Sequence, residues 1–170
     1  MHAPLRLLIL TCALALAACA AIPVFSPVAT YVVVRHAEKV DDGSRDPSLT
    51  DAGRARAHAL AELLRSRDVV AVYATDFRRT RDTAEPTAAV HDLSIISYDA
   101  EAPAEAVAER LRRAHATGTV LVVGHSNTVP GIVSALCGCE VAPIDESDYG
   151  NMFEVRIRDG AAPVLSQRRY

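Results

Sequence analysis

Residues 31–36 read Tyr-Val-Val-Val-Arg-His, and residues 119–125 read Thr-Val-Leu-Val-Val-Gly-His. Both are apolar, β-branched runs, which is typical of strands buried on both faces of a parallel sheet. Each run leads directly into a histidine. Because the carboxyl ends of parallel strands lie at one edge of a sheet, where ligands bind, we expect His36 and His125 to lie near one another at that edge.

Around these two runs, strand patterns alternate with helix patterns. The expected elements, in chain order, are strand 31–34, helix 50–65, strand 69–73, helix 76–90, strand 93–98, helix 105–115, strand 119–123, helix 126–136 and a hairpin of strands 153–157 and 164–167. Thr50 and Ser126 are the expected N-caps of two of the helices. This alternation predicts the fold class, an α/β protein with a mostly parallel sheet in a three-layer α/β/α sandwich.

The size and charge of the chain exclude several classes of protein. A length of 170 residues fits one domain, and 50% hydrophobic residues argue against disorder. The 18 basic and 21 acidic residues are nearly balanced, so we expect no nucleic-acid partner.

The N-terminus has the pattern of an export signal. Arg6 is followed by an apolar run at residues 7–17, which is too short to span a membrane. Leu16-Ala17-Ala18-Cys19 resembles a bacterial lipobox, in which the cysteine carries lipid. We therefore expect a lipoprotein signal peptide at 1–18, a tether at 19–29 and one domain at 30–170, anchored to a bacterial membrane through Cys19. The expected side is periplasmic, on the outer membrane in a Gram-negative source. An ordinary signal peptide or a buried first helix, with Cys19 incidental, are the alternatives.

Two further cysteines lie close together in the expected domain. The two cysteines of Cys137-Gly138-Cys139 are too close in sequence for an unstrained disulfide. No other cysteine or histidine stands at the spacing of a zinc site. We expect two small side chains at a helix end rather than a redox pair.

Cations gather where the expected strands end. Arg35 stands beside His36, and Arg78 and Arg79 follow the second strand. Together with His125 and the helix expected to begin at Ser126, they predict a site for a multiply charged oxyanion such as phosphate. A zinc site on the two histidines is the alternative, which the arginines disfavour.

Four blocks of sequence carry a resemblance to a known family. They are residues 34–39 (Val-Arg-His-Ala-Glu-Lys), 49–53 (Leu-Thr-Asp-Ala-Gly), 73–84 and 122–128 (Val-Val-Gly-His-Ser-Asn-Thr). In this order and spacing, the chain resembles the histidine phosphatase superfamily, the phosphoglycerate mutase-like group. Ala37 departs from the pattern, because many relatives have glycine there.

The resemblance implies a phosphatase that needs no metal or other cofactor. His36 would form a phosphohistidine that water hydrolyses, while Arg35, Arg79 and His125 would hold the phosphoryl oxygens. Arg79 is preferred to its neighbours because Arg78 can pair with Asp82, and Arg81 with Glu85, one helical turn away.

The proton donor to the leaving group is not marked by any motif. Asp99 and Glu101 both follow the third expected strand, where many members of the family carry an acid. Glu38 and Lys39 either lie at the mouth of the site or form a surface ion pair. We expect the remaining helix histidines to be exposed or half-buried; they are His58, His91 and His115.

The expected function is hydrolysis of a phosphomonoester or phosphoramidate. The substrate would be a small phosphorylated molecule or a phosphoprotein. The alternatives are a phosphohistidine-protein phosphatase and a non-catalytic, phosphate-binding lipoprotein on the same scaffold.

Overall fold

A computed structural model describes residues 27–170 of the chain. The expected signal peptide, Cys19 and most of the expected tether lie outside the described residues. The first strand begins at Val28, so the last two residues assigned to the tether are part of the sheet. Among residues 27–170, no helix combines the length and apolar character that a membrane span requires.

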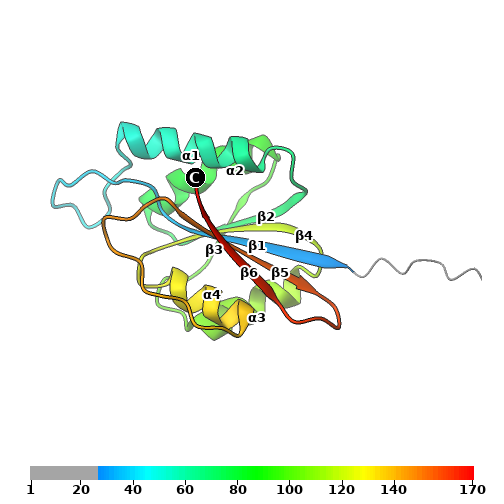
Figure 1. The fold of residues 1–170 in the computed structure, drawn as a ribbon. Helices are drawn as coiled ribbons and strands as arrows, with labels where there is room; N and C mark the ends of the chain where they lie inside the picture. Colours follow the sequence, from blue (N-terminus) through cyan, green and yellow to red (C-terminus); the bar gives the residue numbers. More distant parts are fainter. Residues whose placement is uncertain (1–26) are drawn as a thin grey trace, which may run out of the picture.

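The domain is a six-stranded sheet between two pairs of helices (Figure 1). The elements are β1 (Val28–Arg35), α1 (Asp51–Leu64), β2 (Val69–Ala74), α2 (Arg78–Val90), β3 (Ile95–Ser97), α3 (Ala104–Ala114), β4 (Gly118–Gly124), α4 (Val129–Cys137), β5 (Asn151–Arg158) and β6 (Val164–Arg169). The sheet order is β3-β2-β4-β1-β5-β6, in which the first four strands are parallel. The last two form the antiparallel terminal hairpin. The predicted α/β/α sandwich with a mostly parallel sheet is confirmed.

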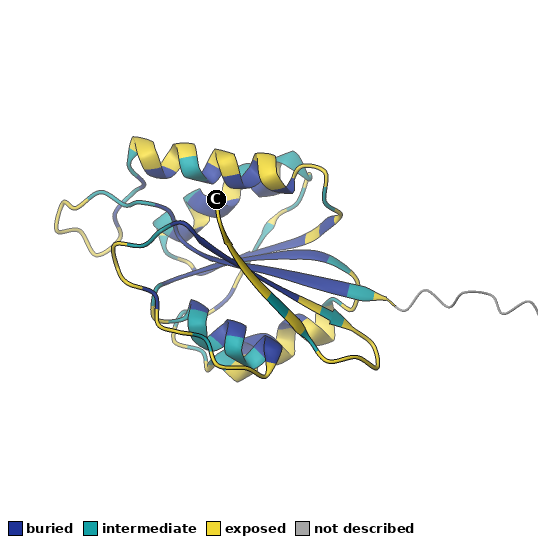
Figure 2. Ribbon diagram, in the orientation of Figure 1, coloured by how far each residue is buried: buried dark blue, intermediate teal, exposed yellow. Residues whose placement is uncertain are grey.

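The central strands are buried on both faces, as their continuous apolar runs predict. In β1, Tyr31 and Val33 pack into the core beneath α3 and α4, and Val32 and Val34 pack into the core beneath α1 and α2. All four are at most 1% exposed, and Figure 2 shows the dark, buried strands at the centre of the sheet. Because β1 packs into the core on both faces of the sheet, its carboxyl end is held in place next to that of β4.

The predicted N-cap is confirmed for α1 and wrong for α4. The Thr50 hydroxyl accepts the N–H of Gly53 at 3.0 Å and caps α1, as predicted. Ser126 does not cap α4, which begins three residues later at Val129. The chain instead turns through residues 126–128, where the carbonyl of His125 accepts the N–H groups of Thr128 and Val129.

The prediction for the paired cysteines was also wrong. Cys137 and Cys139 form a disulfide, with their Cα atoms 5.2 Å apart. Gly138 between them has a left-handed backbone (φ +66°) and ends α4. That conformation, which glycine adopts without steric cost, folds the chain sharply enough to bring the two cysteines within disulfide range.

Candidate active site

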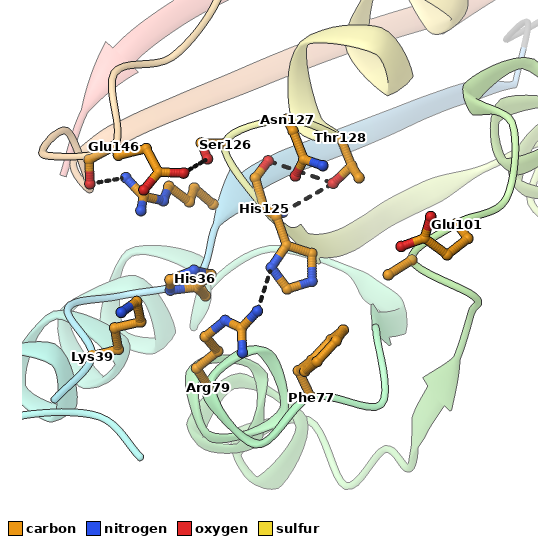
Figure 3. A pocket seen from close by; sticks show the side chains of 12 residues that line it. His36, Lys39, Phe77, Arg79, Glu101, His125, Ser126, Asn127, Thr128 and Glu146 are labelled. Carbon is orange, nitrogen blue, oxygen red and sulfur yellow. Dashed lines mark hydrogen bonds between the residues drawn. The ribbon is translucent and has the colours of Figure 1, made fainter. Parts of the chain in front are cut away.

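The two histidines at the strand ends lie together, as expected from the parallel pairing of β1 and β4. The N–H of His36 donates to the carbonyl of Gly124 at 2.9 Å, which fixes the two strand ends side by side. The rings of His36 and His125 are 5.5 Å apart between centroids. Both residues are buried, at 3% and 8% exposure. They line an open pocket of about 200 Å³ at the carboxyl edge of the sheet (Figure 3).

His36 is held as a neutral imidazole with one nitrogen free. Its Nδ1 lies 2.8 Å from the carbonyl of Ala37, and because a carbonyl only accepts, Nδ1 carries the proton. The lone pair is therefore on Nε2. The pKa of His36 is lowered to about 3, chiefly by burial; the Ala37 carbonyl opposes this shift, and the charges of Arg35, His125 and Arg79 add to it.

The backbone beside His36 is fixed by helix α2. The N–H of Ala37 donates to the Thr83 hydroxyl at 2.9 Å, and that hydroxyl donates to the carbonyl of Arg79 at 2.7 Å. Thr83 thus links the segment carrying the first histidine to the turn of α2 that carries Arg79.

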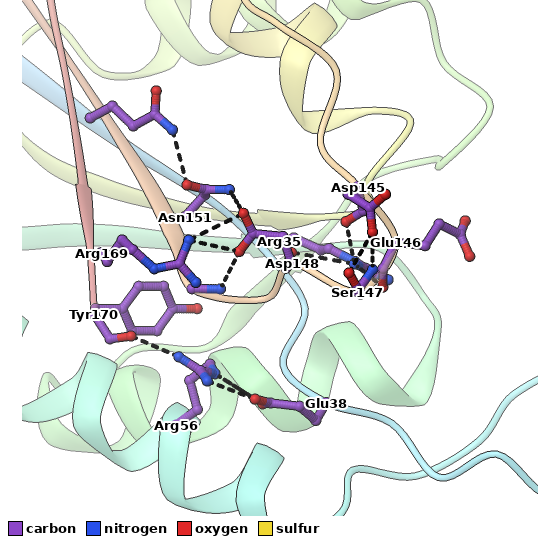
Figure 4. Close-up of polar contacts among 12 residues, drawn as sticks. Arg35, Glu38, Arg56, Asp145, Glu146, Ser147, Asp148, Asn151, Arg169 and Tyr170 are labelled. Atoms are coloured by element: carbon purple, nitrogen blue, oxygen red, sulfur yellow. Dashed lines mark hydrogen bonds and ion pairs between the residues drawn. The ribbon is translucent and has the colours of Figure 1, made fainter.

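Arg35 is anchored by a distant loop. One of its terminal nitrogens donates to the carbonyls of Asp145, Glu146 and Asp148, at 3.1, 2.6 and 3.3 Å. The ring of Tyr149 stacks on the guanidinium at 4.1 Å. Figure 4 shows this loop closing over Arg35. The residue is 2% exposed, so its charge is held rigidly at the pocket wall.

Arg79 and His125 form the opposite wall. A terminal nitrogen of Arg79 lies 3.5 Å from Nδ1 of His125, and the guanidinium stacks on Phe77 at 4.3 Å. Since arginine only donates, Nδ1 of His125 accepts, and its Nε2–H donates to the Thr75 hydroxyl at 2.9 Å. Burial lowers the pKa of His125 to about 4, and the charges of Arg79 and Arg35 act in the same direction.

Both arginines of the pocket retain a hydrogen-bond donor that the described residues do not satisfy. The Nε atoms of Arg35 and Arg79 are both buried and have no hydrogen-bond partner among residues 27–170. A buried guanidinium N–H without an acceptor is costly, and a bound oxyanion would satisfy both. The described residues contain no group of three or more histidine, cysteine, aspartate or glutamate side chains placed to hold a metal ion.

The structure separates the two acids proposed as proton donors. Glu101 lines the pocket, whereas the carboxylate of Asp99 accepts the N–H of Glu101 in a local turn and does not line it. A second acid in the pocket, Glu146, was not singled out by sequence reasoning; its carboxylate lies 3.4 Å from the Ser126 hydroxyl. Its only sequence signal is its place in the loop that precedes β5.

Glu38 and Lys39 do not pair with each other. Glu38 makes a two-pronged ion pair with Arg56 of α1, with closest atoms 2.7 Å apart, and the same guanidinium donates to the carbonyl of Tyr170 (Figure 4). Lys39 lines the mouth of the pocket. Of the other histidines, His58 is exposed. The other two histidines predicted on helices, His91 and His115, are half-buried and lie away from the pocket, as predicted.

The lowered pKa values of the two site histidines predict a stability that falls in mild acid. Unfolded histidines titrate near 6.5, whereas His36 and His125 titrate near 3 and 4 in the folded state. Between pH 6.5 and about 4 the unfolded chain therefore binds protons that the folded chain does not. The free energy of unfolding should fall as the pH falls, by about 1.4 kcal/mol per pH unit for each histidine.

Urea denaturation at pH 7, 6 and 5 measures this slope. His36→Asn and His125→Asn should each reduce the slope by the contribution of one histidine, about 1.4 kcal/mol per pH unit. The exposed control His58→Asn should leave the slope unchanged. Equal slopes in all four proteins would show that the two site histidines are not held neutral.

Comparisons with known proteins agree with this geometry. Residues 31–101 match the family model for the histidine phosphatase superfamily (branch 1). The structure of the protein histidine phosphatase SixA complexed with tungstate superposes with a TM-score of 0.70 at 20% identity, over 82% of this chain and 96% of that one. A mycobacterial glucosyl-3-phosphoglycerate phosphatase, Rv2419c, gives a TM-score of 0.65 at 16% identity, over 85% and 99%.

A curated relative matches a shorter stretch of sequence. The uncharacterized protein Rv0525 of Mycobacterium tuberculosis is 47% identical over 47 residues, which are 28% of this chain and 23% of that protein. The match thus spans about a quarter of the relative's length. The match of residues 31–101 to the family model, the fold and the strand-end histidines with their arginines all support membership of the histidine phosphatase superfamily.

Proposed function

We propose that the protein is a metal-independent phosphatase that hydrolyses a phosphomonoester or phosphoramidate through a phosphohistidine on His36. One observation carries the proposal. A buried, neutral imidazole with a free Nε2 shares a pocket with Arg35 and Arg79, and a buried N–H of each arginine has no acceptor within the described part of the chain. A phosphoryl group satisfies both requirements, because its oxygens accept hydrogen bonds while its phosphorus accepts the lone pair.

In the first step, Nε2 of His36 attacks phosphorus and the bond from phosphorus to the leaving atom breaks. The guanidiniums of Arg35 and Arg79 stabilise the charge on the transferring oxygens. The proton stays on Nδ1, which donates to the Ala37 carbonyl, and this hydrogen bond stabilises the cationic ring of the phosphohistidine. Entry of a dianion raises the pKa of His125, so that its Nδ1 can take up a proton and donate to a phosphoryl oxygen.

Glu101 is the proposed proton carrier, because it lines the pocket and Asp99 does not. Its carboxyl group protonates the leaving atom in the first step. In the second step the resulting carboxylate takes a proton from the water that attacks phosphorus, and the bond from phosphorus to Nε2 of His36 breaks, which returns the lone pair to Nε2. Inorganic phosphate leaves, and both His36 and Glu101 return to their starting protonation states.

The test uses protein lacking residues 1–19, an aryl phosphate and a phosphoramidate, each assayed with and without a metal chelator. We expect turnover that the chelator leaves unchanged. Loss of turnover on chelation would refute the metal-independent mechanism. Failure to hydrolyse any phosphorylated compound, together with retained phosphate binding, would favour the non-catalytic binding protein.

A phosphohistidine-protein phosphatase is the second candidate function. The fold likeness to a structure described as the protein histidine phosphatase SixA supports it, as does the open pocket at the surface. Imidazole is a better leaving group than an alkoxide, so such a substrate depends less on Glu101. Glu101→Gln should then slow hydrolysis of an alkyl phosphate much more than that of a phosphohistidine peptide.

We also propose that the protein is exported and anchored through a lipid on Cys19. The lipobox-like sequence at residues 16–19 supports this. In a bacterial host, full-length protein should partition into the membrane fraction and carry a lipidated cysteine by mass spectrometry. Cys19→Ser should move it out of that fraction, whereas Cys12→Ser, a change within the expected signal, should not. Equal partitioning of the three proteins would contradict the anchor.

A further inference from the structure

A second cavity adjoins the phosphate pocket. Its volume is about 120 Å³, and it lies between α3, α4 and the segment that follows β3. Ala100, Asn127 and Thr128 line both the pocket and this cavity. The two spaces are therefore neighbours that share one wall.

The lining of the second cavity is uncharged and mostly apolar, and its polar members are Tyr98, Asn127 and Thr128. Ala102, Ala104 and Gly131 leave the space open, and Val107 and Ile132 contribute the buried apolar surface. A Cβ added at Gly131 would lie 3.1 Å from the Cβ of Ala104, so the two helices are already close at this point. Among residues 27–170, no charged side chain lines the cavity, so a charged group would enter without a partner.

The cavity is also tied to the reacting groups. The hydroxyl of Thr128, on the shared wall, accepts the backbone N–H of His125 at 3.0 Å. In Figure 3, Thr128 and Glu101 lie on the far side of His125 from His36. In an in-line displacement, the leaving group lies on the side of phosphorus opposite the attacking Nε2. That side faces the shared wall and Glu101.

We propose that this cavity is the leaving-group subsite and that it selects phosphorylated compounds with a short, uncharged, apolar group beyond the phosphoryl oxygen. The inference rests on the proposed phosphatase function and names its substrate class. At the ~30 Å³ that one water occupies in the liquid, 120 Å³ holds roughly four heavy atoms. A chain of about three or four carbons therefore fills the subsite, and longer chains extend into solvent.

Non-hydrolysable alkylphosphonates test the subsite without requiring turnover. Titration calorimetry from methyl- to hexylphosphonate should show the dissociation constant falling by about fourfold for each added methylene, and then levelling after about four carbons. A terminal ammonium or carboxylate on the four-carbon chain should cancel the gain. A dissociation constant independent of chain length would overturn the proposal.

Two substitutions localise the effect. Ala102→Leu fills the cavity and should abolish the dependence on chain length while preserving the affinity for methylphosphonate. Ala106→Leu, on the exposed face of α3 outside the cavity, is the matched control and should retain the wild-type series. Val107→Ala enlarges the cavity and should move the levelling point to longer chains. Identical series for Ala102→Leu and Ala106→Leu would overturn the assignment.

A separate measurement on the same protein tests the proposed function independently of the subsite. Aryl phosphate turnover is measured on the same wild-type preparation. Absent turnover with a clear chain-length series would refute the phosphatase and retain an apolar subsite beside an anion site. Normal turnover with a flat series would refute the subsite alone.

Discussion

Replacing His36 by alanine is expected to lower kcat for every phosphorylated substrate by roughly 10⁴-fold or more, because the first covalent bond of the reaction forms on its Nε2. The remaining groups can still bind and polarise the phosphoryl group but have no nucleophile to receive it. His36→Asn should be equally inactive, although its amide can still donate to the Ala37 carbonyl that holds the imidazole at 2.8 Å. Agreement of the two variants separates lost nucleophilicity from lost local structure.

Trapping the intermediate gives a direct readout of the same step. Wild-type protein quenched during turnover of a phosphorus-labelled substrate should carry an acid-labile, alkali-stable label on the peptide that contains residue 36. His125→Ala should still acquire the label at the same position, more slowly, because His125 contacts oxygens rather than phosphorus. Label on the His36→Ala protein, or undiminished kcat, would show that the nucleophile lies elsewhere.

The pairing of His36 with His125 was predictable because it depends on two local facts and one topological rule. Continuous valine runs indicate strands buried on both faces, and parallel strands place the residues that follow them at one edge. The hydrogen bond from the N–H of His36 to the carbonyl of Gly124 shows that β1 and β4 end side by side, as this rule predicts. The cap on α1 was equally predictable, because Thr50 and Gly53 are three residues apart and their hydrogen bond needs no distant partner.

Features that depend on distant segments were not predictable from the same signals. Arg35 owes its position to carbonyls more than a hundred residues away, and backbone carbonyls carry no sequence signature. Asp46 accepts the N–H of Arg78 at 2.8 Å and so supports the start of α2, although nothing in its loop marks it as a cap. Ser126 is a residue type that often caps helices, but it lies in a turn in which the carbonyl of His125 accepts the N–H groups of Thr128 and Val129. Local propensity is overridden at this point by the geometry of the site.

Arg79 provides the second large expected effect. Arg79→Ala should lower kcat/KM by about 10²- to 10³-fold, the loss typical of one well-placed donor to a transition-state oxyanion. It should also weaken the binding of inorganic phosphate. The fold should survive, because the substitution removes a desolvated guanidinium whose Nε has no partner among residues 27–170 and whose polar contacts are long, at 3.5 Å to His125 and 3.8 Å to Asp46. Arg35→Ala is a poorer test, since it would remove three part-buried hydrogen bonds to loop carbonyls and so disturb the loop as well as the pocket.

Arg78 is the matched control, because it is the adjacent arginine on the same helical turn. Its side chain is 64% exposed and pairs with Asp82 at 3.7 Å, the pairing expected from the sequence, and such surface pairs contribute only about 0.3–0.5 kcal/mol. Arg78→Ala should therefore change kcat/KM by less than about threefold. Arg79→Lys keeps the positive charge but loses the planar stacking on Phe77 and the second donor, so we expect it to recover only part of the activity. If Arg78→Ala and Arg79→Ala were equally active, the phosphoryl oxygens would not be bound at this wall of the pocket. Adjacent residues point about 100° apart around an α-helix, and the side chain of Arg78 is 64% exposed whereas that of Arg79 is 15% exposed. The contrast therefore tests the orientation of the site rather than the charge of the helix.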